Sequence, residues 1–301
     1  MEIIWLIEKN TFDEEAAERL RVVLDQKDIS WCSPEYVPFD PVVNESTKKY
    51  LFGAKRYLVV PYGAIGFIKS IIGFYRNVHD RDLSYNPCMM WCDFKVLNWA
   101  HYSAYWSEFL VSDQFAIIPY GVLKRNLDYY FGLFGKEDNH NSMTMFVRPA
   151  TNDKVFTGQL LYREKAAHTL EYMGYNVQAD IPDNTLTVIA PPKQILGEWR
   201  SLIIDGKIIS ISRYACKGGV SNQMNDDNNP DVRALLEKIA AYKWQPDEAY
   251  IADVARVGNE YKLLEIGSPN CAGWYQMDVE KIVDAIQKKA FDYIEYAASM
   301  V

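Results

Sequence analysis

The sequence is short of positive charge. Its 301 residues include 32 Lys and Arg against 40 Asp and Glu, which gives a formal net charge of −8. This balance disfavours broad binding to nucleic acids or anionic membranes, because both attract basic surfaces. It does not exclude a nucleotide, because a few local cations together with Mg²⁺ would dominate the potential at such a site.

Long hydrophobic runs and reactive clusters are also missing. No apolar segment reaches the roughly 18 residues of a membrane-spanning candidate, and the acidic start MEIIWLIEK reads as a strand rather than a signal peptide. The odd number and scattered spacing of the cysteines indicate free thiols, and we expect a cytoplasmic protein. The cysteines are Cys32, Cys88, Cys92, Cys216 and Cys271, and neither they nor the four histidines form a metal-ligand or nucleophile motif.

The chain also lacks a Walker A sequence, since Gly-x-x-x-x-Gly-Lys-Ser/Thr does not occur. Residues 146–158 read instead as a strand carrying Arg148, which Pro149 ends, followed by a polar loop with Lys154. A cation at a strand end and a lysine in the next loop are typical of a phosphate-cradling loop. The alternative reading is a plain surface turn.

What the chain does contain is a well-marked hairpin over residues 198–214. Asp205-Gly206 between two apolar strands predicts a type I′ turn, which places Glu198 opposite Arg213 and puts Arg200 on the same face. One reading of these charges is an ion pair on a solvated face. The other is an anion site, because a guanidinium fork matches phosphate or carboxylate.

A second hairpin carries two carboxylates. Residues 250–257 and 260–266 read as strands around Gly258-Asn259. A three-residue loop would place Asp253 opposite Glu265, whereas a two-residue loop would turn them to opposite faces. Both lie among apolar residues, where an unpaired carboxylate is costly to bury. A bound divalent cation would explain the placement; the alternative is that each faces solvent at a sheet edge.

Two further segments bear on organisation. Leu186–Lys193 reads as a strand that ends in Pro191-Pro192. The two prolines would form either a stiff hinge or a simple rigid linker. In a hinge, the main chain just before the prolines could form hydrogen bonds with the edge of an adenine. Residues 216–230 form a long polar segment after Arg213, and we expect either a mobile lid over phosphates or a surface loop.

The N-terminal part predicts a small α/β lobe. Residues 3–7 and 56–60 read as strands, and Thr11-x-x-Glu14 reads as a capping box that opens a helix between them. A polar, turn-rich segment around 134–142 marks the expected boundary. We therefore expect an N-terminal lobe over 1–140 and a second domain over 141–301, divided near residue 190.

In this order the motifs resemble those of the ATP-grasp superfamily. They are Val-Arg-Pro with a following Lys-x-Phe-Thr-Gly, the proline hinge, Glu-Trp-Arg leading into the Asp-Gly hairpin that ends Ser-Arg-Tyr, then Asp, Glu-Ile and Ala-Gly-Trp-Tyr. The resemblance covers roughly residues 144–280 and is closest to the clade with two arginines and one lysine, often seen in phage and bacterial proteins. It implies an α/β (α+β) ATP-grasp fold, in which two α+β subdomains grip the nucleotide behind a small α/β lobe.

The resemblance also implies roles for particular residues. Lys154, Arg200 and Arg213 would be the catalytic residues, and the two arginines would hold the γ-phosphate or an acyl phosphate. Asp253 and Glu265 would bind Mg²⁺. The ATP-binding set would be Arg148, Lys154, Ile189, Ala190, Pro191, Glu198, Arg200 and Arg213. In one respect the chain departs from the pattern. The family usually follows its glutamate with Ile-Asn, a further metal ligand, but Gly267 stands here, and Asn270 is the candidate substitute.

These features give three function classes. The first is an ATP- and Mg²⁺-dependent ligase that joins a small-molecule or peptide carboxylate to an amine or thiol through an acyl phosphate, releasing ADP and phosphate. The second is a phosphotransferase on the same scaffold. The third is a non-catalytic nucleotide-binding interaction protein, which Gly267 favours slightly. We expect no membrane partner, and a homodimer is one expected state.

Overall fold

The computed structural model describes residues 1–9, 13–37, 44–53, 55–76, 85–152, 155–173, 180–216 and 223–300. The chain forms two compact units. Unit 1 comprises Met1–Cys92, Gly197–Asp253 and Ile266–Val301; unit 2 comprises Asp93–Leu196 and Val254–Glu265. Residues 93–140 group with the segment that follows them, and the domain boundary near residue 140 remains a prediction from the sequence.

Unit 1 begins with a parallel three-stranded sheet in the order β2-β1-β3. Strands β1 (Glu2–Ile7) and β3 (Tyr57–Tyr62) are almost entirely buried, which is typical of parallel strands covered on both faces. The remaining elements of this segment are α1 (Glu14–Gln26), β2 (Trp31–Cys32), α2 (Glu45–Leu51) and α3 (Ile65–Arg76). The predicted α/β lobe is thus present, with β3 extending two residues beyond the expected end.

Helix α1 begins one residue after Asp13, whose side chain accepts a hydrogen bond from the Ala16 amide. This N-cap satisfies one of the free amides of the first turn. Thr11 of the predicted capping box lies outside the described residues. One face of α1 is fully buried and consists of Ala16, Ala17, Leu20 and Leu24.

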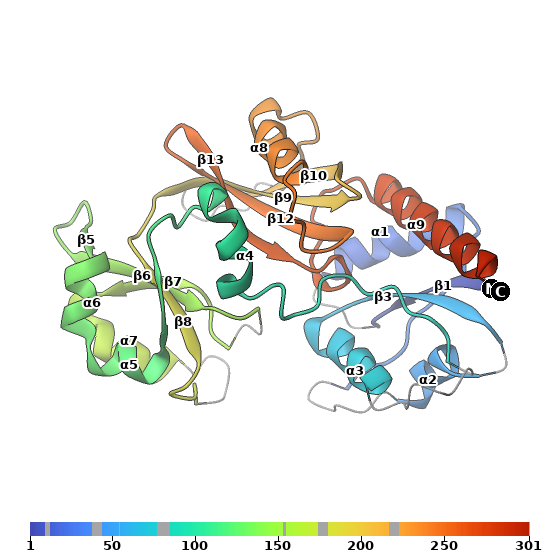
Figure 1. The fold of residues 1–301 in the computed structure, drawn as a ribbon, viewed down its shortest axis with the longest axis horizontal. Helices are drawn as coiled ribbons and strands as arrows, with labels where there is room; N and C mark the ends of the chain where they lie inside the picture. Colours follow the sequence, from blue (N-terminus) through green and yellow to red (C-terminus); the bar gives the residue numbers. More distant parts are fainter. Residues whose placement is uncertain are drawn as a thin grey trace. The chain divides into compact units, whose positions relative to one another are not determined.

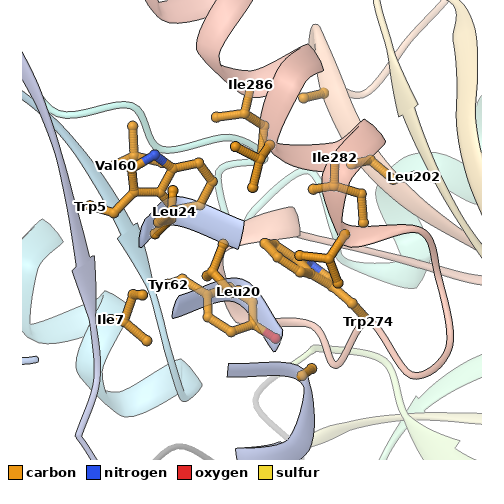
Figure 2. Close-up of a cluster of buried hydrophobic side chains, with 14 of the residues drawn as sticks. Trp5, Ile7, Leu20, Leu24, Val60, Tyr62, Leu202, Trp274, Ile282 and Ile286 are labelled. Atoms are coloured by element: carbon orange, nitrogen blue, oxygen red, sulfur yellow. The ribbon is translucent and has the colours of Figure 1, made fainter. Parts of the chain in front are cut away.

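The core of unit 1 joins segments far apart in the sequence. Figure 2 shows side chains of β1, α1 and β3 packed with Leu202, Trp274 and two isoleucines of α9 (Val279–Ser299). The Trp274 indole lies 4.4 Å from the Tyr62 ring and 6.5 Å from the Trp5 ring. Helices α1 and α9 lie side by side (Figure 1). The buried residues of α9, which include Ile282, Val283 and Ile286, recur at helical spacing.

The second sheet has the order β11-β10-β9-β12-β13. Its strands are β9 (Ile195–Ile204), β10 (Lys207–Cys216), β11 (Met224–Asn225), β12 (Ala249–Val257) and β13 (Glu260–Gly267), with α8 (Pro230–Ala240) between β11 and β12 and the turn η4 (Pro269–Cys271) after β13. Residues 254–265, which form the end of β12, the turn and most of β13, belong to unit 2. Two residues, Gly258 and Asn259, connect β12 to β13.

The Asp205-Gly206 turn is confirmed, and both residues have positive φ, 49° and 70°. Beyond the turn the predicted register is wrong. Ile209 is an extra residue in β10, so Arg213 pairs with Trp199 and not with Glu198. A β-bulge of this kind shifts all later pairs by one position.

The polar segment after β10 is anchored where the structure describes it. Residues 217–222 lie outside the described residues. Asp227, further along, accepts hydrogen bonds from the Ser210 hydroxyl at 2.7 Å and the Ile211 amide at 2.6 Å, and its second oxygen lies 2.6 Å from the Lys281 ammonium. The second half of the expected mobile loop is therefore held against β10 and α9.

Unit 2 is built on an antiparallel sheet in the order β4-β8-β6-β5, with β7 also paired to β6. Its elements are α4 (Trp99–Trp106), η1 (Ser107–Phe109), β4 (Ala116–Pro119), α5 (Tyr120–Arg125), α6 (Leu127–Phe134), β5 (Lys136–Glu137), β6 (Met143–Pro149), β7 (Gln159–Tyr162), η2 (Arg163–Lys165), α7 (Ala166–Tyr172) and β8 (Leu186–Ala190). One sheet face, which includes Met145, Val147 and Ile189, packs against α5, α6 and α7.

Among the described residues, no helix combines the length and apolar character needed to cross a membrane. All five cysteines are free in the structure.

The packing of α1 gives a stability prediction. Leu20→Ala should lower the free energy of unfolding by about 2–5 kcal/mol, because it removes a fully buried side chain and leaves a cavity. Val22→Ala on the same helix should change it by less than about 0.5 kcal/mol, since Val22 is 45% exposed. Urea denaturation of both variants makes the comparison, and equal losses would contradict the described orientation of α1.

Candidate functional site

A buried ion pair in unit 1 joins β9 to β12. The Arg200 guanidinium donates to both oxygens of Asp253, from Nε at 2.8 Å and from Nη2 at 2.6 Å. Its third nitrogen donates to the Gly273 carbonyl at 3.1 Å. The Asp253 side chain is 1% exposed and that of Arg200 13%. This is a bidentate, buried ion pair with a fixed geometry.

Two tyrosines complete the surroundings of Arg200. The Tyr214 and Tyr275 rings stack at 4.8 Å, and the Arg200 guanidinium carbon lies 5.5 Å and 5.0 Å from their centres. The Tyr214 hydroxyl donates to Glu198 at 2.7 Å. Guanidinium groups bind aromatic rings in this way, and the contact restricts the orientation of Arg200.

Tyr214 occupies the place that the sequence pattern assigned to Arg213. A second bulge makes Tyr214 the extra residue between Arg213 and Ala215, so Tyr214 shares a face with Glu198 and Arg200. Arg213 contacts the Met224 sulfur at 2.9 Å, and its buried Nε has no hydrogen-bond partner among the described residues. The structure thus brings together Glu198 and Arg200 from the predicted set and places Arg213 apart from them.

The charges of this cluster reinforce one another. Burial disfavours the charged form of Arg200, but the adjacent Asp253 carboxylate outweighs it and holds the pKa of Arg200 well above its ordinary value. Burial, with Asp253 and Glu198 nearby, raises the pKa of Tyr214 well above its usual range. Arg200 is therefore a permanent cation, and Tyr214 is a neutral hydrogen-bond donor at physiological pH.

Unit 2 contains a second arginine–carboxylate pair. Arg148 of β6 donates from Nη2 to Glu265 of β13 at 2.8 Å, with 15% and 29% of the two side chains exposed. The Arg148 guanidinium carbon lies 5.1 Å from the centre of the Trp99 ring. The candidate metal carboxylates Asp253 and Glu265 are thus each bonded to an arginine of their own unit.

The connection between β12 and β13 has two residues, which is the shorter of the two alternatives. With strict alternation, that length turns Asp253 and Glu265 to opposite faces. Their different arginine partners agree with this.

The predicted hinge lies at the end of β8. Ile189 is paired with Ala116 of β4 on one side and Val147 of β6 on the other, and its side chain belongs to the core of unit 2. Ala190 still pairs with β6, at Phe146, but lies beyond the last pair with β4. The main chain at Ala190 and Pro191, and not at Ile189, therefore matches the predicted adenine-reading edge. Lys154 lies outside the described residues.

Asn270 has a structural role that the sequence reading did not anticipate. Its amide nitrogen donates to the carbonyls of Pro61 at 2.8 Å and Met89 at 3.1 Å, and its oxygen accepts from the Trp91 amide at 2.9 Å and the Ser268 hydroxyl at 3.3 Å. Both lone pairs of that oxygen are used, so coordination of a metal would break two hydrogen bonds. At Gly267 an added Cβ would meet only Ile251, at 3.7 Å, which is ordinary contact.

Sequence reasoning also missed Glu8, at the end of β1. It is 4% exposed and accepts a hydrogen bond from the Ala64 amide just before α3. An added Cβ at Gly63 would lie 2.7 Å from its Oε2 atom, so the glycine makes room for the carboxylate. Burial raises the pKa of Glu8, and the Ala64 hydrogen bond opposes that shift in part.

Comparison with known proteins now identifies the chain. Residues 131–285, just over half of it, match a family described as an ATP-grasp domain, the second family of its clade. The chain belongs to the ATP-grasp family. Its fold is accordingly the ATP-grasp fold with mixed α/β content, as the motif order predicted. No curated protein matches the sequence.

Solved ATP-grasp structures resemble the whole chain. D-cycloserine synthetase DcsG shares 12% identity over 95% of this chain and 99% of its own, with a TM-score of 0.61. D-alanine–D-alanine ligase from Bacillus anthracis, complexed with ATP, shares 10% identity over 99% of this chain and 100% of its own, with a TM-score of 0.59. The ATP-grasp ligase PsnB, complexed with a minimal precursor, shares 11% identity over 95% of this chain and 98% of its own, with a TM-score of 0.52. At these identities the likeness shows the fold alone.

The buried carboxyl of Glu8 predicts a pH dependence. Its pKa is raised above the ordinary 4.5, so its contribution to stability is fully present below about pH 4.5 and is lost as pH rises through the folded value. Glu8→Gln keeps a hydrogen-bond acceptor for Ala64 and cannot ionise. In chemical denaturation the variant should therefore gain stability relative to wild type as the pH rises above about 4.5. Exposed Glu164→Gln is the control, and a parallel trend in both variants would refute the assignment to Glu8.

Proposed function

We propose that the protein is an ATP- and Mg²⁺-dependent ligase that joins a carboxylate to an amine or thiol through an acyl phosphate. The observation that carries the proposal is the pairing of strand arginines with strand carboxylates, Arg200 with Asp253 and Arg148 with Glu265, in a chain of the ATP-grasp family. Phosphoryl transfer needs such groups for positioning and charge neutralisation and needs little covalent chemistry from the protein.

Mg²⁺ fits the available donors. Carboxylate oxygens are its preferred ligands, and it is usually held by one or two carboxylates with the remainder supplied by phosphates and water. Within the described ranges, no cluster of three or more His, Cys, Asp or Glu could hold a metal on its own. Asp253 and Glu265 are the candidate ligands, and each would need nucleotide phosphates and water to complete the coordination of an ion. Bound Mg²⁺ would withdraw charge from the phosphates. We leave Asn270 out of this set because its oxygen is already used.

The chain's own residues would act as follows. We assign the two arginines and one lysine of the clade to Arg200, Arg213 and Lys154. Arg200 would neutralise the transferred phosphoryl group, and Lys154 would contact it from the loop after β6. Arg213, which contacts Met224 and lies apart from Arg200 in this structure, would have to turn from Met224 to join them. Arg148 would bind nucleotide phosphate, and Glu198 would keep Tyr214 against Arg200.

The chemistry proceeds in two steps. A carboxylate oxygen of the substrate attacks the γ-phosphorus, the bond to the β-phosphate oxygen breaks, and ADP leaves. The amine or thiol then attacks the acyl carbon, phosphate leaves with the electrons of the broken C–O bond, and the nucleophile releases a proton to solvent. Neither step requires a histidine or cysteine base. The three solved neighbours named above are a synthetase and two ligases by their titles, which supports this reaction class.

The substrates we propose are a small-molecule or peptide carboxylate and an amine, in the cytoplasm. A homodimer is compatible with this function and is not required by it.

The test measures products. The protein is incubated with ATP, Mg²⁺, pooled amino acids or short peptides, and hydroxylamine, which traps acyl phosphates as hydroxamates. We expect ADP, phosphate and hydroxamate in equal amounts. Asp253→Ala/Glu265→Ala should lower the rate by at least about 100-fold, while Asp128→Ala/Glu164→Ala, which removes two exposed carboxylates, should not.

The other function classes give different products. ADP with a phosphorylated acceptor and no hydroxamate would replace the ligase with a phosphotransferase. Binding of ATP without turnover for any acceptor would favour the nucleotide-dependent interaction protein.

A further inference from the structure

Tyr275 has a backbone conformation that its residue type rarely adopts. Its φ is 46°, in the left-handed region, where a bulky side chain is disfavoured. Among the described residues that share this feature, Asp28, Asn141 and Asp205 are of the types that enter the region most readily. A glycine at position 275 would adopt the conformation without strain. The ring of Tyr275 is therefore kept at a cost in backbone free energy.

The chain on both sides of Tyr275 is fixed. Trp274 is 1% exposed in the core of unit 1, and its carbonyl accepts a hydrogen bond from the Met277 amide at 2.9 Å. The Gln276 amide donates to the hydroxyl of Ser212 in β10 at 3.1 Å. These contacts leave the residue between them little freedom, so the left-handed turn at Tyr275 determines where its ring lies.

The Tyr275 ring lies beside Arg200. The guanidinium carbon is 5.0 Å from the ring centre, and the Tyr214 ring stacks on Tyr275 with the two planes 13° apart. The three guanidinium nitrogens donate to oxygens of Asp253 and Gly273. Rings and oxygens thus restrain the guanidinium through different contacts. The ring contact can therefore remain when an oxygen partner of Arg200 changes.

Backbone strain of this kind persists where the surrounding structure enforces it, and it is concentrated at functional sites. We propose that Tyr275 is a positioning residue, whose ring keeps the Arg200 guanidinium in the orientation that phosphoryl transfer requires. The inference rests on the proposed function of Arg200 and adds a residue that acts only through that arginine. It predicts that the reaction rate depends on the ring at position 275, whereas stability depends on the backbone there.

Three variants separate the ring from the backbone. Tyr275→Ala removes the ring and keeps a Cβ atom in the left-handed conformation, Tyr275→Gly removes both the ring and the strain, and Tyr275→Phe keeps the ring. Because glycine adopts positive φ freely, Tyr275→Gly should melt at a higher temperature than Tyr275→Ala. Thermal melting of each variant makes this comparison and confirms that each is folded.

The rate should follow the ring. Tyr275→Ala and Tyr275→Gly should each lower kcat for hydroxamate formation at least about 10-fold, because a misplaced group loses transition-state stabilisation. KM for MgATP should change by less than about 3-fold, since the lost interaction acts mainly in the transition state. Tyr275→Phe should restore kcat to within about 3-fold of the wild-type value.

A second readout does not depend on turnover. The Arg200 Nε–H group donates to Asp253 at 2.8 Å, and its proton–nitrogen NMR signal is assigned by its loss in Arg200→Lys. Removal of the Tyr275 ring should shift this signal and speed its exchange with water at least about 10-fold, because the guanidinium opens more often. Tyr275→Phe should keep the slow exchange of the wild type.

The matched control relieves strain outside the site. Asp28 is exposed and also has a positive φ, 54°, in unit 1. Asp28→Gly should leave kcat and the Arg200 signal unchanged. A fall in kcat equal to that of Tyr275→Gly would attribute the effect to backbone flexibility and overturn the inference.

The outcomes separate this inference from the function beneath it. If Tyr275→Gly keeps the wild-type kcat and Arg200 signal, Tyr275 is not a positioning residue and the proposed function stands. If kcat follows stability, so that Tyr275→Gly is clearly more active than Tyr275→Ala, the role of Tyr275 is structural only. If the wild type forms no hydroxamate, the proposed function fails, and the NMR signal still decides whether Tyr275 restrains Arg200.

Discussion

The ion pair between Arg200 and Asp253 is the interaction on which the candidate site depends. It links β9 to its neighbour β12, and through the Gly273 carbonyl it also fixes the loop that follows η4. The same loop supplies Tyr275, which stacks on Tyr214 beside the guanidinium. Loss of either charge would leave the other buried without its partner, so the two residues stabilise the sheet only together.

The position of this pair depends in turn on the core of unit 1. Trp274 follows Gly273 directly and packs against Tyr62 of β3, while the Tyr62 hydroxyl donates to the Ala272 carbonyl at 3.2 Å. Through its side-chain amide, Asn270 also links the same segment to Pro61 near the end of β3 and to Met89. The parallel sheet of the N-terminal segment therefore supports the loop that contacts Arg200. Asn270 therefore supports the site by holding this loop in position, without contacting Arg200 or Asp253 in the hydrogen bonds described above.

Much of the fold follows from local patterns in the sequence. The continuous apolar runs of β1 and β3, the Asp205-Gly206 turn and the apolar spacing of α9 each carry enough information for a correct prediction. The order of motifs identified the ATP-grasp fold because family members keep that order. The register of β9 and β10 could not be predicted, since two bulges, at Ile209 and Tyr214, leave no mark in the hydrophobic alternation.

The errors at the site have the same origin. Counting residues from the turn put Arg213 beside Glu198, whereas the bulges put Tyr214 there. Asn270 was a reasonable metal ligand by residue type, but its hydrogen bonds to Pro61 and Met89 join segments about two hundred residues apart, which no local pattern reveals. Packing between distant segments is hidden from the sequence as well: residues of α5 and α6, within 93–140, pack with β6 and β8.

The most direct measurement is a crystal structure of the protein with ADP and Mg²⁺. The account predicts that the Arg200–Asp253 hydrogen bonds of 2.8 and 2.6 Å are lost. Asp253 should then coordinate the metal, and Arg200 should contact a phosphate of ADP or point to the position that the γ-phosphoryl group of ATP would occupy. Bound nucleotide and metal with the Arg200–Asp253 pair unchanged would contradict it, and would leave Arg200 as a structural residue of the sheet.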